Sequence, residues 1–276
     1  MLMYVDPIAV KLGGLEIRWY AIIIVAGIAL AIYLSSREAV KVGLREDDVV
    51  DFMLWGLPIS IIGARLYYVL FELPYYIKNP GEIFAIWNGG LAIYGALIAG
   101  GLTLFFFCRH NFINFWTFLD ITGPSIILAQ AIGRWGNFMN HEAFGPDTTR
   151  NFLEKLHLPN FIIDNMYIDG IYRTPTFLYE SVWNVLGFIV LVLLRRKKNF
   201  FKQGEIFAGY VIWYSFGRFF IEGLRTDSLY MFGTIRVSQF LSALLFVGGI
   251  LFIVLRRKLK PKLAFYDRTQ RKEGAK

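Results

Sequence analysis

Seven long apolar runs constrain the fold of this chain more than any other feature. An α-helix needs ~20 residues to cross the hydrocarbon core of a membrane, and each run has or nearly has that length. The runs are Ile17–Ser35, Val49–Phe71, Gly90–Phe107, Phe112–Ala131, Thr176–Leu194, Gly204–Ile221 and Val237–Leu255. They predict an all-α polytopic membrane protein with about seven transmembrane helices, organised as one integral-membrane domain over residues 1–276.

Composition supports this class and excludes several others. The chain is 56% hydrophobic, whereas soluble domains are about 45–50% apolar even when glycine is counted. The single cysteine, Cys108, excludes an internal disulfide, and the three histidines lack metal-ligand spacing. We therefore expect no metal and no cofactor. The basic tail, about 256–276, is expected to lie against anionic lipid, with no nucleic acid as partner.

The distribution of lysine and arginine predicts the orientation. The connections after the first, third, fifth and seventh runs, with the tail, carry eighteen of these residues, and the opposite side carries nine. Because positive charge accumulates in cytoplasmic loops, we expect the N-terminus outside and the C-terminus in the cytoplasm. The longest connection, about 134–175, is then a small external cap between the fourth and fifth spans.

The stretch Ile132–Gly145, at the end of the fourth span, is the most informative part of the chain. Its polar residues are Arg134, Asn137, Asn140, His141 and Glu142. Polar groups at membrane depth are costly, and by default they mark a functional site. Glycines at positions 133, 136 and 145 predict an interrupted helix whose backbone folds tightly around a ligand.

A second polar cluster ends the sixth span. At ~100° per residue, Tyr214, Arg218, Glu222 and Arg225 fall within about 80° of one another on a helix. One interpretation is an internal i,i+4 ion pair between Arg218 and Glu222, which stabilises a helix by only ~0.2–0.5 kcal/mol. An arginine inside a span costs ~2.5–3.5 kcal/mol on insertion scales. The comparison favours an occupied polar cavity.

Both clusters lie at the outer ends of their spans, so we expect Arg134 and Arg218 at similar depth. Two guanidinium groups among amide and hydroxyl donors suit a phosphate ester, and an anionic phospholipid headgroup is the abundant phosphate there.

Among other polar residues in the spans, Arg65 is expected to be buried with a partner. Asp120 is either that partner or a structural group at a helix end, and Glu180 is a further site candidate.

Taken together, these motifs closely resemble the signature of bacterial prolipoprotein diacylglyceryl transferases. The matching segments are Ile17-Arg18-Trp19-Tyr20, Gly63-Ala64-Arg65-Leu66, Trp87-Asn88-Gly89-Gly90, the Gly133–Gly145 stretch and the Tyr214/Arg218/Glu222/Arg225 face. The resemblance implies a seven-span enzyme of the bacterial plasma membrane. Such enzymes move the diacylglyceryl group of phosphatidylglycerol to the thiol of the lipobox cysteine in a preprolipoprotein. They form a thioether and release glycerol phosphate, which is the first step of lipoprotein maturation.

The resemblance also assigns roles to residues. It implies that Arg134 and Arg218 hold the phosphate or leaving group. Further catalytic or substrate-binding places fall to Glu142, Glu222, Asn137, Asn140, Tyr20, Tyr214 and Arg225.

One position departs from the family pattern. Many members have His-Gly-Gly where this chain has Tyr94-Gly95-Ala96, and a tyrosine with a pKa of ~10 is a poor base near neutrality. Either Tyr94 only orients groups, or a carboxylate such as Glu142 or Glu222 is the base, with His141 a weaker candidate.

The rival function is a transporter or scramblase for an anionic substrate, which would need a polar path through the inner half of the membrane as well.

Overall fold

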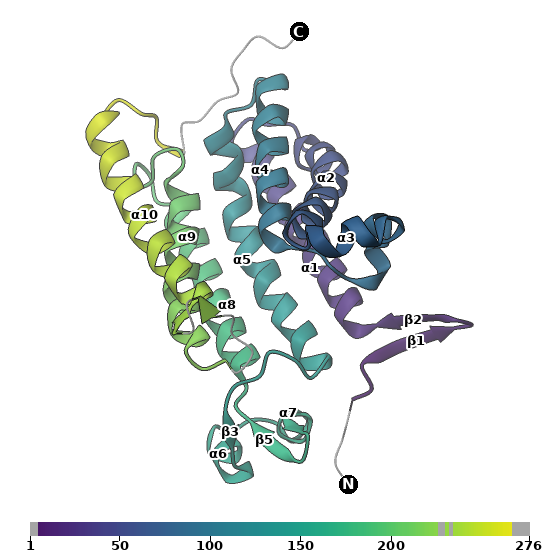
Figure 1. The fold of residues 1–276 in the computed structure, drawn as a ribbon. Coiled ribbons are helices and arrows are strands. Elements are labelled where there is room, and N and C mark those ends of the chain that lie inside the picture. Colours follow the sequence, from purple (N-terminus) through teal and green to yellow (C-terminus); the bar gives the residue numbers. More distant parts are fainter. Residues whose placement is uncertain (1–4, 226–229, 232–233, 267–276) are drawn as a thin grey trace. The chain divides into compact units, whose positions relative to one another are not determined.

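The computed structural model of this chain describes residues 5–225, 230–231 and 234–266 and is mainly helical (Figure 1). Its long helices are α1 (Trp19–Lys41), α2 (Asp48–Phe71), α4 (Ile93–His110), α5 (Phe115–Met139), α8 (Thr176–Arg195), α9 (Glu205–Glu222) and α10 (Val237–Leu259). The shorter helices are α3 (Leu73–Lys78), α6 (Arg150–Lys155), α7 (Asn160–Asn165), η1 (Pro80–Phe84) and η2 (Ile86–Asn88). The strands are β1 (Ile8–Leu12), β2 (Leu15–Arg18), β3 (Asp147–Thr148), β4 (Tyr167–Ile168), β5 (Ile171–Arg173), β6 (Tyr230–Met231) and β7 (Ile235–Arg236).

Each of the seven predicted runs forms a long helix, which confirms the expected all-α polytopic class. Among the described residues, six of these helices are long and apolar enough to cross a membrane. The remaining one, α9, carries Glu205, Arg218 and Glu222. The helix that fits a membrane least well by composition is therefore the one that carries the second polar cluster.

The described chain divides into two compact units. One contains residues 5–34 and 119–266, and the other contains residues 35–118. In the first unit α9 packs against both α8 and α10, and in the second α2 packs against α4.

The glycines at the end of α5 do not interrupt the helix, so the predicted break is wrong. The helix continues to Met139, and both Gly133 and Gly136 lie inside it. A Cβ atom at Gly136 would lie 2.9 Å from the ring of Tyr20, and one at Gly133 would lie 3.2 Å from the side chain of Ile24. These glycines instead let α1 approach α5 closely.

Gly145 lies beyond the helix and is also tightly packed. A Cβ atom there would lie 2.9 Å from the Thr176 side chain and 3.1 Å from the Leu224 carbonyl oxygen. All three glycines therefore lie at close contacts, but of the three only Gly145 lies outside the helix.

A reciprocal tryptophan pair joins α8 to α9. The rings of Trp183 and Trp213 stack with their centroids 4.5 Å apart. Each indole N–H donates to the other residue's backbone carbonyl, at 3.0 and 2.9 Å. Each ring also covers a glycine of the opposite helix, because a Cβ at Gly187 or Gly217 would come within 2.4 or 2.2 Å of it. The pair fixes the register of the two helices that carry Glu180 and Arg218.

We expect Gly217→Ala to lower the free energy of unfolding by ~1–3 kcal/mol, because the added methyl group overpacks this contact. Gly248→Ala in α10 is the matched control, since a Cβ there meets no described atom within 4 Å. Alanine has less backbone freedom than glycine in the unfolded chain. In the control the free energy of unfolding should therefore stay unchanged or rise by up to ~1 kcal/mol. The measurement is thermal unfolding of both variants in one detergent. Equal melting temperatures would show that the tryptophan pair can move to accept the methyl group at little cost in free energy, and the prediction would be wrong.

A small cap between α5 and α8 matches the predicted cap region. Strands β3, β5 and β4 form a three-stranded antiparallel sheet in that order, accompanied by α6 and α7 (Figure 1). The cap has its own apolar core, which includes Phe138, Leu153, Ile162, Ile163, Met166 and Phe177. Because Phe138 belongs to α5 and Phe177 to α8, this core attaches the cap to the ends of both helices.

Candidate active site

Glu180, in the first turns of α8, is the centre of the candidate site. Its side chain is 5% exposed, and its two oxygens face arginines from different parts of the chain. Arg134 of α5 places Nε 3.1 Å from one oxygen, and Arg218 of α9 places Nη1 3.1 Å from the other. Arg225, just beyond α9, places Nη1 3.7 Å from the oxygen that Arg218 contacts. The two polar clusters of the sequence therefore meet at one carboxyl group.

Arg218 also forms the i,i+4 ion pair considered from the sequence. Its Nη2 lies 2.5 Å from a carboxylate oxygen of Glu222, whose side chain is 2% exposed. Arg236 donates a hydrogen bond to the backbone carbonyl of Glu222. The local ion pair is real, but the same guanidinium also bonds Glu180 on another helix. Neither interpretation alone describes Arg218.

Hydrogen bonds extend the network from Arg134 towards the cap. Arg134 donates to the side-chain oxygen of Asn137 at 3.2 Å, and Asn137 donates to Glu142 at 2.8 Å. Glu142 is exposed. His141 faces the side-chain oxygen of Asn165 at 3.4 Å. A continuous chain of polar contacts thus runs from Glu222 through Glu180 to Glu142.

The remaining predicted residues occupy different environments. The side-chain oxygen of Asn140 is buried and accepts no hydrogen bond within the described part of the chain. Tyr20 packs on Gly136, one residue from Asn137. Tyr214 lies one turn before Arg218, with its ring 6.1 Å from that of Tyr210.

Tyr94 belongs to the other unit, so its role stays a prediction. It lies in the first turn of α4, where its ring centroid is 6.4 Å from that of Tyr67 on α2.

The charges around Glu180 favour an anion. Three guanidinium groups face two carboxylates there, those of Glu180 and Glu222, which leaves one net positive charge. Low exposure strengthens these interactions relative to water. No group of three or more His, Cys, Asp or Glu side chains suitable for a metal ion occurs among the residues described. The arrangement can stabilise a phosphate or another developing negative charge.

Sequence reasoning underestimated Glu180 and left the partners of Arg65 and Asp120 open. Asp120 accepts hydrogen bonds from the backbone N–H groups of Gly204 and Phe207 at 2.6 and 2.9 Å, so it caps the start of α9. Arg65 bonds backbone carbonyls of its own unit. Asp120 is thus the structural helix-end group. The only available signal for Glu180 was a carboxylate at the start of an apolar run, which does not reveal its partners.

Comparison with known proteins decides the family. A sequence model described as prolipoprotein diacylglyceryl transferase matches residues 7–255. The chain belongs to this family. A phosphatidylglycerol–prolipoprotein diacylglyceryl transferase of Enterococcus faecalis is 69% identical over 273 residues, covering 99% of this chain and 98% of the relative.

Two further relatives carry the same name. The Pediococcus pentosaceus protein is 57% identical and covers 92% of this chain and 91% of its own length. The Listeria monocytogenes serotype 4b protein is 56% identical and covers 95% and 94%. The similarity therefore extends over nearly the whole of this diacylglyceryl transferase family member, including both polar clusters.

Proposed function

We propose that this chain transfers the diacylglyceryl group of phosphatidylglycerol to the thiol of the lipobox cysteine in a preprolipoprotein. The products are a thioether-linked lipoprotein precursor and glycerol phosphate. The observation that carries the site assignment is the convergence of Arg134 and Arg218 on the two oxygens of Glu180. Family membership supports the reaction itself, and the charge of this cluster supports its location.

The arginines suit the leaving group. Two nitrogens of Arg134 and two of Arg218 face protein partners in ion pairs or hydrogen bonds, whereas a guanidinium has five N–H donors. Each arginine therefore has donors to offer a phosphate, in the fork geometry that matches phosphate oxygens. Glu180 sets the spacing between the guanidinium groups of Arg134 and Arg218. Arg225 adds positive charge, and Tyr20, Tyr214, Asn137 and Asn140 complete the proposed substrate-binding set.

The chemical step balances without a further reactant. The cysteine sulfur of the substrate attacks the glycerol carbon that bears the phosphate oxygen, and a carbon–sulfur bond forms as the carbon–oxygen bond breaks. The bonding electrons move to the phosphate oxygen, where Arg134 and Arg218 stabilise the departing charge. The thiol proton passes to a base, because the thiolate is the effective nucleophile.

Glu142 is the better base on grounds of access. It is exposed, and Asn137 orients its carboxylate with a hydrogen bond of 2.8 Å. Glu222 is buried and holds Arg218 at 2.5 Å. We therefore assign proton transfer to Glu142 and orientation of Arg218 to Glu222.

The chain is a multi-pass membrane protein, and we propose the bacterial plasma membrane as its location. The excess of lysine and arginine after α1, α4, α8 and α10 supports an orientation with the N-terminus outside and the C-terminus in the cytoplasm. Arg134 and Arg218 lie near the opposite ends of their helices from this charge, so the site opens to the outer side.

The deciding experiment uses purified protein, phosphatidylglycerol and a lipobox peptide. We expect stoichiometric release of glycerol phosphate with a thioether-linked peptide, and no release when the peptide cysteine is serine. Fluorescent phosphatidylglycerol in vesicles tests the rival function through its movement between leaflets. Lipid movement without any peptide product would favour a scramblase and overturn the transferase assignment.

Cys108→Ser should leave transferase activity within about twofold of the unaltered protein, because the reacting thiol belongs to the substrate. Cys108 is buried at the end of α4, and no step above uses it. Initial rates with saturating peptide provide the measurement. A folded but inactive serine variant would indicate a covalent intermediate on the enzyme instead.

A further inference from the structure

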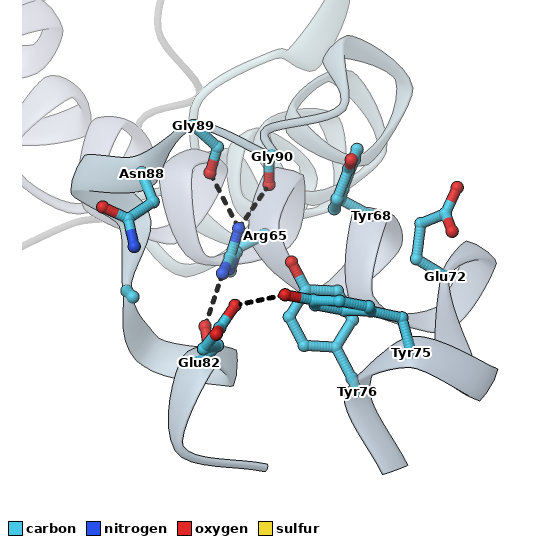
Figure 2. Close-up of a pocket in the computed structure, with 10 residues that line it drawn as sticks. Arg65, Tyr68, Glu72, Tyr75, Tyr76, Glu82, Asn88, Gly89 and Gly90 are labelled. Carbon is cyan, nitrogen blue, oxygen red and sulfur yellow. Dashed lines mark hydrogen bonds between the residues drawn. The ribbon is translucent and has the colours of Figure 1, made fainter. Parts of the chain in front are cut away.

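A cavity of about 460 Å³ opens in the unit of residues 35–118, at the end of α2 (Figure 2). Its polar wall comes mainly from Arg65, Tyr68, Glu72, Tyr75, Tyr76 and Glu82. Its volume lies in the range usual for small-molecule sites, about 300–1,000 Å³. None of these residues belongs to the network around Glu180, and the proposed reaction does not use them.

Arg65 lies at the back of the cavity, and its guanidinium is already hydrogen-bonded to the backbone. It donates to the carbonyl oxygens of Glu82, Ile83, Gly89 and Gly90 at 2.6, 2.8, 2.8 and 3.0 Å. Figure 2 shows its guanidinium directed at these loops. These bonds fix the connection between α2 and α4. Arg65 is therefore a structural cation here and not a receptor for a phosphate.

The opposite walls offer negative charge and aromatic rings. The Tyr75 hydroxyl donates to Glu82 at 2.7 Å, and this bond raises the pKa of Tyr75, so the hydroxyl stays neutral. Glu72 is a second exposed carboxylate on the other side of the tyrosines (Figure 2). The rings of Tyr75 and Tyr76 meet edge to face at 5.2 Å. Carboxylates beside such rings are the groups that bind an organic cation.

Tyr76 offers a ligand in the cavity a further hydrogen-bonding group. Its side chain is buried, at 6% exposure. Its hydroxyl has no hydrogen-bond partner among the residues that the structure describes, and Figure 2 shows it directed into the cavity beside Arg65. The rest of the side chain is enclosed by protein, so the hydroxyl is the part of Tyr76 that a molecule in the cavity can reach. A ligand that brings a polar atom to this place would satisfy it.

Exposed apolar residues next to the lining residues in the sequence indicate where the ligand comes from. These are Phe71, Ile77, Phe84 and Trp87, which are each more than two-thirds exposed. Phe71 ends α2, and the other three lie between α2 and α4, which are both candidate membrane spans. Large apolar and aromatic side chains at the end of a span lie at the membrane–water interface. A ligand would therefore reach the cavity from the lipid surface.

We propose that this cavity binds the headgroup of a phospholipid that carries a primary ammonium group. Glu72 and Glu82 balance the ammonium charge, the faces of Tyr68 and Tyr75 contribute cation–π attraction, and the Tyr76 hydroxyl bonds the headgroup. This site has the opposite charge preference to the arginine cluster around Glu180. One chain thus holds an anionic substrate lipid at one place and an aminophospholipid at another.

The test measures lipid binding to the full-length protein by native mass spectrometry. The ligands are short-chain phosphatidylethanolamine, phosphatidylcholine and phosphatidylglycerol, with free ethanolamine phosphate as the soluble source of the same headgroup. We expect phosphatidylethanolamine to bind most tightly at this site. In Glu72→Gln/Glu82→Gln its dissociation constant should rise about tenfold, the usual effect of losing a charged hydrogen bond. Tyr76→Phe should weaken it about threefold.

Glu46→Gln, an exposed carboxylate of the same unit, is the matched control and should leave binding unchanged. Melting temperatures establish that each variant is folded, and phosphatidylglycerol binding should not change in any of them. Equal phosphatidylethanolamine affinity in the double variant and in Glu46→Gln would overturn the site. Equal affinity for ethanolamine phosphate and the intact lipid would overturn the lipid as its source.

Discussion

Replacing Arg218 with lysine should reduce kcat by about 10²–10³, the loss seen when one donor to a developing negative charge is removed. Lysine keeps the charge but has no planar fork. Arg218 uses two nitrogens, bonding Glu180 at 3.1 Å and Glu222 at 2.5 Å. A single ammonium cannot hold both carboxylates and a phosphate in the same geometry. Arg134→Lys should behave similarly, because Arg134 forms an ion pair with Glu180 and a hydrogen bond with Asn137.

Initial rates at saturating lipid and peptide provide the measurement, with Arg150→Lys as control. Arg150 lies in the cap, where it forms an exposed ion pair with Glu154 at 2.8 Å and contacts the buried Asp164 at 3.3 Å. Lysine keeps the charge, and neither pair belongs to the network around Glu180, so the activity of this variant should change little. Near-normal turnover in both Arg218→Lys and Arg134→Lys would mean that charge alone suffices, and the phosphate clamp would be wrong.

Replacing Glu142 with glutamine should lower the rate at neutral pH by about 10²–10⁴, the usual contribution of a general base. The amide keeps the size of the side chain but cannot take a proton. The loss should shrink as the pH rises. Free thiols ionise near pKa ~8.5, so at alkaline pH the substrate thiolate forms without help.

Two variants separate this role from simple orientation. Glu222→Gln should also lose most activity, because Arg218 loses a partner, but alkaline pH should not restore it. Tyr94→Phe should lose only about three- to twelve-fold, which corresponds to one hydrogen bond of ~0.5–1.5 kcal/mol. A thousandfold fall in Tyr94→Phe, with loss of the alkaline limb, would transfer the proton-accepting role to Tyr94.

The sequence was sufficient for the helices and the family. Each apolar run became a helix because length and hydrophobicity act locally, and α9 formed despite Glu205, Arg218 and Glu222. The predicted span topology also put Arg134 and Arg218 at the outer ends of their spans, and both contact Glu180 in the structure. Helix formation and family motifs depend on residues that are close together in the chain, so they can be predicted from the sequence.

The tertiary structure decided which groups pair and what the glycines do. Gly136 was expected to break α5, yet it lies within the helix, where its missing side chain leaves room for Tyr20 of α1. Asp120 caps α9, and Glu180 forms ion pairs with arginines from two other parts of the chain. Partners of this kind are distant in sequence, and the packing of helices selects them. A residue's type sets which bonds it can make, but only its neighbours in space determine which bonds it does make.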